Sequence, residues 1–354
     1  MVTAPVASAP RRRSIDRSAG WITGLLLALL PAIVTAADDV DAVYFDDTPL
    51  SELLTYPDWF KKSFLDLPGD LDEAVNAGKK GIILYFGQKR CPYCERLIDV
   101  NFGEPDITRY TRAHFELVPI DIHGIDEVTD LRGTVLSERD LAVREDATFT
   151  PTLLFYDADS ALALRLRGYY PPFYFRAALE YVVGEHYRRE PFNVYLERGD
   201  ETLTFELGDL VEEDFFSPSP HQLDRSRISA ERPLAVFFEQ GNCHACTILH
   251  GQTLRDPAIR RFFVDELDTV QLDMRSDTPV ITPDGRRTSA RAWADELGLF
   301  YAPAIVFFDE SGREILRIDS VAHFFRLRNV LNYVANRGYL YEPAYQRWRT
   351  QYGF

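Results

Sequence analysis

The feature that most constrains the fold of this chain is an internal duplication that needs no gap. Cys243 follows Cys91 by 152 residues (243 − 91), and Cys246 follows Cys94 by the same interval. Solenoid repeats recur at roughly 20 to 50 residues, so each copy is expected to be a whole domain with its own core. The same interval superposes further identical residues: Phe86 and Phe238, Gln88 and Gln240, Pro105 and Pro257, Pro151 and Pro303, and Tyr187 and Tyr339.

Within the first copy, the apolar pattern predicts alternating strands and helices. The continuous apolar run 81–86 is typical of a strand that is covered on both faces. The order of elements predicts an α/β fold, with a mixed central sheet and helices on both faces in each of two domains. We expect helices at 71–80, from 92, at 105–114, from 137 and at 172–186, strands at 81–86, 115–122, 152–156 and 161–167, and an insertion rich in Gly, Asp and Thr at 123–136.

All four cysteines stand in two CxxC spacings, each placed after an apolar run and before an amphipathic one. A strand that delivers the first sulfur to a helix start leaves the second sulfur one turn further on, close enough for a disulfide. The helix N-terminus favours the thiolate, which is the nucleophilic form. We therefore expect Cys91 to attack and Cys94 to resolve the mixed disulfide, and Cys243 and Cys246 to form the second catalytic pair.

The residues that flank the two pairs predict different thiol chemistry. Lys89 and Arg90 precede the first pair, and nearby cations lower the pKa of a thiol. The flank 239–242 carries one anion and no cation, although His244 favours the neighbouring thiolate if it is protonated. The first pair is therefore predicted to be the more readily reduced.

Two alternative roles for the cysteines remain open. A structural disulfide that closes so few residues constrains the unfolded chain little. Four thiolates can also bind one zinc ion, but CxxC pairs that share zinc usually lie about 15 to 20 residues apart.

The layout of each copy resembles the thioredoxin superfamily, over roughly residues 64–191 and 216–343. The resemblance rests on CxxC after the first core strand, on Thr150-Pro151 or Ala302-Pro303 before a hairpin, and on a closing helix. It implies that Pro151 and Pro303 are cis and face the disulfides, and that the backbones of Thr150 and Ala302 bind an extended substrate segment.

Two departures from the superfamily pattern concern the same sites. Arg90 and Asn242 stand where a tryptophan is usual, and Tyr85 and Phe237 stand where a buried acid is usual. Without that acid, proton removal from the resolving thiol must rely on another group, such as water or the insertion. The strings YFGQKRCPYCERL and PTLLFYDADS are moreover similar to those of periplasmic thioredoxin-like proteins associated with sulfur oxidation.

The first 36 residues resemble a signal peptide. Four arginines at 11–13 and 17 precede the apolar stretch 21–34, and small residues follow to Ala36, after which we expect cleavage. The alternative is a membrane anchor, but the stretch is shorter than the ~20 residues that span a bilayer, and Pro31 interrupts it. Removing four arginines and one aspartate changes the formal charge from −16 to −19, which argues against nucleic acid and anionic membrane surfaces as partners.

Together these patterns predict a signal peptide at 1–36, a first domain with an N-terminal extension at 37–191, a linker at 192–215, and a second domain with a C-terminal tail at 216–354. The expected function is a periplasmic reductase of protein disulfides that needs no cofactor beyond its cysteines and binds no metal. Its partners would be protein thiols or disulfides and an electron donor, and the resemblance suggests a sulfur-carrier or cytochrome protein. The alternatives are a disulfide isomerase, and a peptide-binding scaffold whose second domain has lost redox activity.

Overall fold

The computed structural model describes residues 45–199 and 209–352. The signal peptide predicted at 1–36 lies outside these residues. In the ranges 45–199 and 209–352, no helix is long and apolar enough to cross a membrane.

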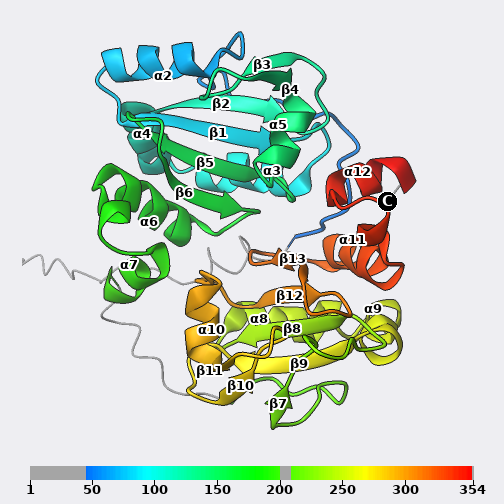
Figure 1. Ribbon diagram of the computed structural model, residues 1–354. Coiled ribbons are helices and arrows are strands. Elements are labelled where there is room, and N and C mark those ends of the chain that lie inside the picture. Colours follow the sequence, from blue (N-terminus) through cyan, green and yellow to red (C-terminus); the bar gives the residue numbers. More distant parts are fainter. Residues whose placement is uncertain (1–44, 200–208, 353–354) are drawn as a thin grey trace, which may run out of the picture. The chain divides into compact units, whose positions relative to one another are not determined.

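The first copy forms a four-stranded mixed sheet in the order β2-β1-β5-β6 (Figure 1). Strand β1 pairs parallel with β2 and antiparallel with β5, which in turn pairs antiparallel with β6. Its elements are α2 (Leu67–Asn76), β1 (Gly81–Gly87), α3 (Pro92–Arg96), a π-helical stretch η1 (Leu97–Asn101), α4 (Pro105–His114), β2 (Phe115–Asp121), β3 (Glu127–Thr129), β4 (Val135–Ser137), α5 (Glu138–Arg144), β5 (Thr152–Asp157), β6 (Leu162–Arg167), α6 (Pro172–Val183), a short 3-10 helix η2 (His186–Arg188) and α7 (Phe192–Gly199).

The central strand β1 is buried on both faces, because its side chains alternate between two apolar cores. Ile83 and Tyr85 point into one core, which also contains side chains of α6. Ile82 and Leu84 point into the other, together with side chains of α2 and α5. The predicted α/β fold, with helices on both faces of a mixed sheet, is therefore confirmed.

The second copy repeats this topology in the order β13-β12-β8-β9, with β8 parallel to β9 and antiparallel to β12 (Figure 1). Its elements are β7 (His221–Gln222), β8 (Leu234–Glu239), α8 (His244–Ile248), η3 (Leu249–Thr253), α9 (Pro257–Arg261), η4 (Phe262–Glu266), β9 (Asp268–Asp273), β10 (Pro279–Ile281), β11 (Arg287–Ser289), α10 (Ala290–Glu296), β12 (Ala304–Phe308), β13 (Glu314–Ile318), α11 (Phe324–Ala335), η5 (Gly338–Leu340) and α12 (Tyr345–Tyr352).

The expected strands agree with the structure to within one residue at each end, and three other expected elements differ more. The helix expected at 71–80 runs from Leu67 to Asn76, because Pro68 suits its first turn and Gly78, with φ +80°, lies beyond its end. The insertion at 123–136 contains β3 and part of β4, which pair as a small hairpin. The helix expected at 172–186 ends at Val183.

The stretch 192–215, predicted above as a linker, contributes side chains to the cores of both copies. Helix α7 begins at Phe192, which is buried against the core of the first copy. Phe215 packs against the core of the second copy, and its ring stacks on Phe263 with 5.4 Å between centroids. In the C-terminal tail, Tyr345 and Trp348 pack edge-on against Tyr333 of the same copy.

The two copies meet at equivalent positions, and all described residues of both belong to one compact unit. The backbone N–H of Val321 donates to the carbonyl of Tyr169 at 3.2 Å, and these residues are 152 positions apart. The neighbouring pair, Gly168 and Ser320, has the same spacing and is also in close contact. We call the contact around these four residues the seam.

Contacts further from the seam are reciprocal. The guanidinium of Arg326 lies 5.1 Å from the ring of Phe149, and the ring of Tyr174 lies 5.3 Å from that of Tyr301. Arg326 and Tyr174 occupy equivalent positions, as do Tyr301 and Phe149. Such reciprocity is the mark of a two-fold interface, so the seam resembles that of a symmetric dimer within one chain.

Replacing Gly168 by Ala is expected to destabilise the protein by about 2–4 kcal/mol. Gly168 has φ +92°, and an added Cβ would lie 1.9 Å from the hydroxyl oxygen of Ser320. Gly133 is the matched control, because it has φ +79° and nothing within 4 Å of an added Cβ, so Gly133→Ala should cost only the backbone strain of about 1–2 kcal/mol. Urea unfolding of both variants measures the difference, and equal losses would contradict close packing at the seam.

Candidate active site

The first cysteine pair lies where β1 gives way to α3. Cys91 is the N-cap of the helix, and its Sγ accepts a hydrogen bond of 3.0 Å from the backbone N–H of Cys94. Pro92 takes the first helical position, where its missing N–H leaves no gap in the hydrogen bonding. The two sulfurs form a disulfide with 5.1 Å between Cα atoms, within the range that a disulfide requires.

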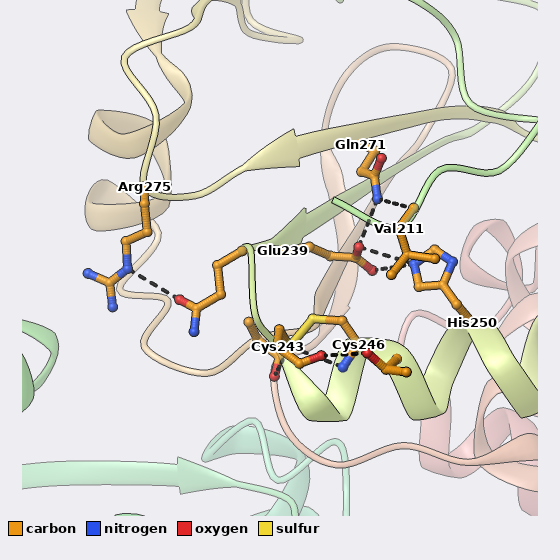
Figure 2. Close-up of a disulfide and its surroundings, with 10 residues drawn as sticks. Val211, Glu239, Cys243, Cys246, His250, Gln271 and Arg275 are labelled. Atoms are coloured by element: carbon orange, nitrogen blue, oxygen red, sulfur yellow. Dashed lines mark hydrogen bonds and ion pairs between the residues drawn. A yellow bond between two sulfur atoms is a disulfide. The ribbon is translucent and has the colours of Figure 1, made fainter. Parts of the chain in front are cut away.

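The second pair repeats this geometry between β8 and α8. Cys243 caps the helix, and its Sγ accepts a hydrogen bond of 3.0 Å from the backbone N–H of Cys246. The Cα atoms of this disulfide lie 5.2 Å apart (Figure 2). Each disulfide thus forms within its own copy.

The structure brings the predicted substrate-binding residues next to the disulfides. The peptide bonds Thr150–Pro151 and Ala302–Pro303 are both cis. The hydroxyl of Thr150 lies 3.3 Å from Sγ of Cys91, and the carbonyl oxygen of Ala302 lies 3.6 Å from Sγ of Cys243. Their role in binding substrate stays a prediction.

The three residues predicted to tune the thiols lie beside the pairs, but the cations of the first copy contact other groups. Arg90 donates to the carbonyl of Leu50 at 2.9 Å and also to that of Ser51, both in the N-terminal extension. Lys89 lies 3.8 Å from the carboxylate of Asp121. His244 is exposed at the start of α8. The predicted difference in reduction potential stays a prediction.

A buried polar network, which was not among the predicted site residues, lies beside the second disulfide. Glu239 ends β8 and is 1% exposed, and its carboxylate accepts from Nε2 of His250 at 3.0 Å (Figure 2). The side-chain amide of Gln271 donates to the same carboxylate at 2.8 Å. Figure 2 shows the carboxylate on the side of the helix that bears Cys246 and His250. The second copy therefore has a buried acid, two positions after Phe237.

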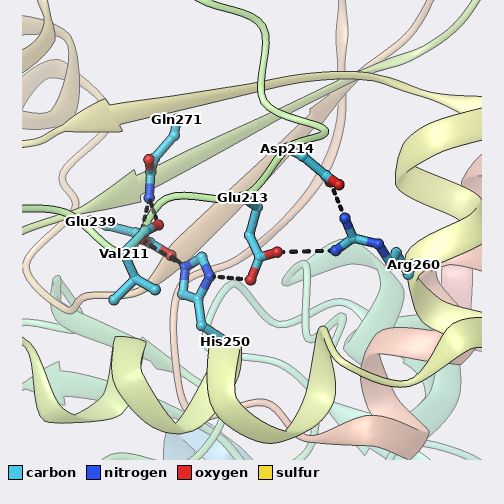
Figure 3. Close-up of polar contacts among 7 residues, drawn as sticks. All are labelled: Val211, Glu213, Asp214, Glu239, His250, Arg260 and Gln271. Atoms are coloured by element: carbon cyan, nitrogen blue, oxygen red, sulfur yellow. Dashed lines mark hydrogen bonds and ion pairs between the residues drawn. The ribbon is translucent and has the colours of Figure 1, made fainter.

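His250 lies between two carboxylates. Its Nδ1 is 3.2 Å from Glu213, which also accepts 3.0 Å from Arg260 (Figure 3). Both ring nitrogens face carboxylate oxygens, an arrangement that favours the charged imidazole with a proton on each nitrogen. Burial lowers the pKa of His250, but hydrogen bonds and charges from Glu239 and Glu213 outweigh burial and raise that pKa above its usual value.

Two signals in the sequence point to this network. His250 stands four residues after Cys246, on the same face of the helix, and it replaces an apolar residue of the first copy, Ile98. Glu239 is the one charged residue in an otherwise apolar strand, and Gly87 is its counterpart. A residue type that changes from apolar to charged between copies marks a place where the copies do different things.

The first copy fills the corresponding space with aromatic rings. A Cβ added to Gly87 would lie 2.6 Å from the ring of Tyr85 and 2.8 Å from the hydroxyl of Tyr56. The two tyrosines pack edge-on with 5.5 Å between centroids. Burial raises the pKa of Tyr56, and the charge of Asp121 raises it further, so this phenol stays neutral. The first pair thus has tyrosines where the second has an ionic network.

Comparison with known proteins agrees with this geometry. The family described as the thioredoxin-like domain matches residues 67–183 and 220–335, together more than half of the chain. No curated protein matches the chain.

Several solved structures are similar to parts of the chain. A thioredoxin-fold protein from Helicobacter pylori is 23% identical, with 41% of this chain and 94% of that chain covered and a TM-score of 0.33. A thioredoxin from Thermus thermophilus is 25% identical, with coverages of 33% and 84% and a TM-score of 0.26. The first two thioredoxin domains of Eps1p from Saccharomyces cerevisiae are 12% identical, with coverages of 78% and 99% and a TM-score of 0.23.

Proposed function

The chain belongs to the thioredoxin-like domain family, and on that premise we propose that it is an exported thiol–disulfide oxidoreductase that reduces disulfides of other proteins. The observation that carries the proposal is the geometry of the two CxxC pairs. Each first cysteine caps a helix directly after a buried strand, with its sulfur bonded to a partner one turn on and beside a residue that precedes a proline.

The chemistry needs only the two cysteines of a pair. In the reduced protein the thiolate of the first cysteine attacks a substrate disulfide, and one substrate sulfur leaves as a thiolate. The thiolate of the second cysteine then attacks the mixed disulfide, so the other substrate sulfur leaves and the CxxC disulfide forms. Two electrons pass to the substrate, whose thiolates take up protons, and a dithiol donor must reduce the CxxC pair again.

The second pair has a buried acid that fits this cycle. When Cys246 resolves the mixed disulfide, it must act as a thiolate. The network of Glu239 and His250 offers a charged site beside the pair that can hold a proton, and Glu213 connects it to the partly exposed Arg260.

The proposed cellular location and partners rest on the sequence. The arginines and the apolar stretch before Ala36 support export, and the acidic mature chain supports a periplasmic protein rather than one that binds nucleic acid. Protein disulfides are the proposed substrates, with sulfur-carrier or cytochrome proteins as the partners that the sequence resemblance suggests.

Trapping with single-cysteine pairs tests the proposal. Cys246→Ser and Cys94→Ser each leave an attacking thiol without its resolving partner, so at least one of the two reduced variants should accumulate mixed disulfides with insulin, visible by mass spectrometry. Cys243→Ser and Cys91→Ser are the matched controls, and they should trap less because the cysteine that remains is the resolving one, which is not expected to attack the substrate. If neither resolving-cysteine variant traps insulin, the protein is a binder rather than a reductase. Recovery of scrambled ribonuclease without net reduction of insulin would indicate an isomerase instead.

A further inference from the structure

The two disulfides differ in how far they can be reached. Cys91 is 1% exposed and Cys94 is fully buried, whereas Cys243 is only half-buried. The sequence gives no reason for this difference, because both pairs occupy the same place in the fold. The cover of the first pair comes from the N-terminal extension and from the second copy.

Arg326, near the start of α11 in the second copy, reaches into the first site. Its Nη2 donates a hydrogen bond of 2.8 Å to the carbonyl of Thr150. Its guanidinium lies 3.4 Å from the ring centre of Tyr93, the residue that directly precedes Cys94. Its Nη1 donates 3.3 Å to the carbonyl of Val321, so the side chain is held in place within its own copy. The carbonyl of Thr150 lies directly before Pro151, where an extended substrate is expected to pair. Arg326 therefore occupies that acceptor from within the chain.

Asp47, in the N-terminal extension, holds this arrangement together. One carboxylate oxygen accepts from the hydroxyl of Tyr93 at 2.7 Å and from the backbone N–H of Arg326 at 2.8 Å. The other oxygen accepts from the N–H of Phe325 at 2.8 Å, and the hydroxyl of Tyr93 also accepts 2.9 Å from the N–H of His323. Asp47, Tyr93 and Arg326 are each at least nine-tenths buried, so water competes little for these bonds.

The space left beside Cys91 is too small for a peptide. A cavity of about 40 Å³ lies there, lined by Arg90, Phe149 and Asn329 among others. That volume holds about three water molecules. An extended segment can reach this disulfide only if Arg326 and its helix move away.

Within residues 45–199 and 209–352, no arginine covers the second site as Arg326 covers the first. The counterpart of Arg326 is Tyr174, which packs edge-on against Tyr301 at 5.3 Å between centroids. A tyrosine ring in this place makes an apolar contact beside Ala302, and Cys243 remains half-exposed. The contacts between the copies thus bury Cys91 and leave Cys243 partly exposed.

We propose that Arg326 is a specificity-determining residue that excludes protein substrates from the first disulfide, so that proteins exchange with the second. This inference rests on the proposed function. Protein disulfides would then react with Cys243 and Cys246. Cys91 and Cys94 would react with small thiols, which do not need to pair with the backbone of Thr150.

The test uses the full chain with only one active pair. In the background Cys243→Ser with Cys246→Ser, adding Arg326→Gln is expected to raise insulin reduction with dithiothreitol by roughly tenfold, which is about 1.4 kcal/mol. Arg328→Gln, two residues along the same helix, is the matched control and should leave the rate unchanged. In the background Cys91→Ser with Cys94→Ser, Arg326→Gln should also leave the rate unchanged. A folded Arg326→Gln protein whose first pair is no faster than its parent would overturn the inference.

A measurement on the unmodified protein covers the case in which Arg326→Gln does not fold. After reduction by dithiothreitol, a polymer-coupled maleimide should label Cys243 roughly tenfold faster than Cys91. Iodoacetamide is a much smaller reagent, so with it the labelling rates of the two cysteines should differ less. Equal labelling of the two cysteines by the polymer reagent would overturn the inference. If the chain with both pairs reduces no insulin at all, the proposed function fails instead, whatever the labelling shows.

Discussion

Removing the second cysteine pair is expected to lower insulin reduction by roughly tenfold or more, whereas removing the first pair leaves most of the rate. The reason is access: the first disulfide must open locally before a protein can reach it, and each 1.4 kcal/mol of opening slows exchange about tenfold. Cys91 is 1% exposed and Cys243 is half-buried, although each caps the equivalent helix of its own copy, α3 and α8.

The two double variants, Cys243→Ser with Cys246→Ser and Cys91→Ser with Cys94→Ser, are matched controls for each other, because each removes the same groups from an equivalent position. The turbidity of insulin chains in the presence of dithiothreitol gives the rate. Similar rates for both variants would mean that the first site opens freely. A reversed order would mean that proteins are reduced at the first site.

His250→Gln is expected to destabilise the protein by about 3 kcal/mol near neutral pH, because it leaves Glu239 buried without its cation. Both residues are almost fully buried, and the pair is joined at 3.0 Å. His244→Gln is the matched control, since His244 is exposed in the same helical segment and its loss should change stability by less than about 0.5 kcal/mol.

The loss should depend on pH in a direction that the raised pKa fixes. A histidine whose folded pKa exceeds its unfolded value of about 6.5 contributes stability that is complete below that value and is lost as pH rises through the folded pKa. The difference between the unmodified protein and His250→Gln should therefore be larger at roughly pH 6 than at roughly pH 9. Urea unfolding at both values measures it. A difference that stays constant with pH would mean that His250 is neutral in the folded protein.

Most of the fold could be predicted because local patterns and the duplication agree. The helix Pro105–His114 was predicted to the residue, since a proline marks its start and a strand follows its end at once. The CxxC geometry followed from the spacing of the cysteines and the apolar run before them. The ends of α2 and α6 were less certain, because single glycines and the last turns of helices are weak signals.

The decisive contacts of the site could not be predicted, because they join residues that are far apart in the chain. Arg326 and Thr150 are 176 positions apart and lie in different copies. Nothing in the neighbourhood of either residue in the sequence indicates the other. The pair of Glu239 and His250 is closer, and comparing the copies position by position points to it.

The self-complementary contact around Gly168 and Ser320 has a consequence for how the two sites came to differ. Two separate identical subunits must place the same side chain on both sides of their axis, so an arginine that blocks one groove would block both. A covalent tether removes that requirement, because it keeps the partners at a high effective concentration even when the contact is uneven. A difference at this one position, Tyr174 in one half and Arg326 in the other, then places an arginine on the carbonyl of Thr150 beside the first disulfide and a tyrosine ring on Tyr301 in the second half.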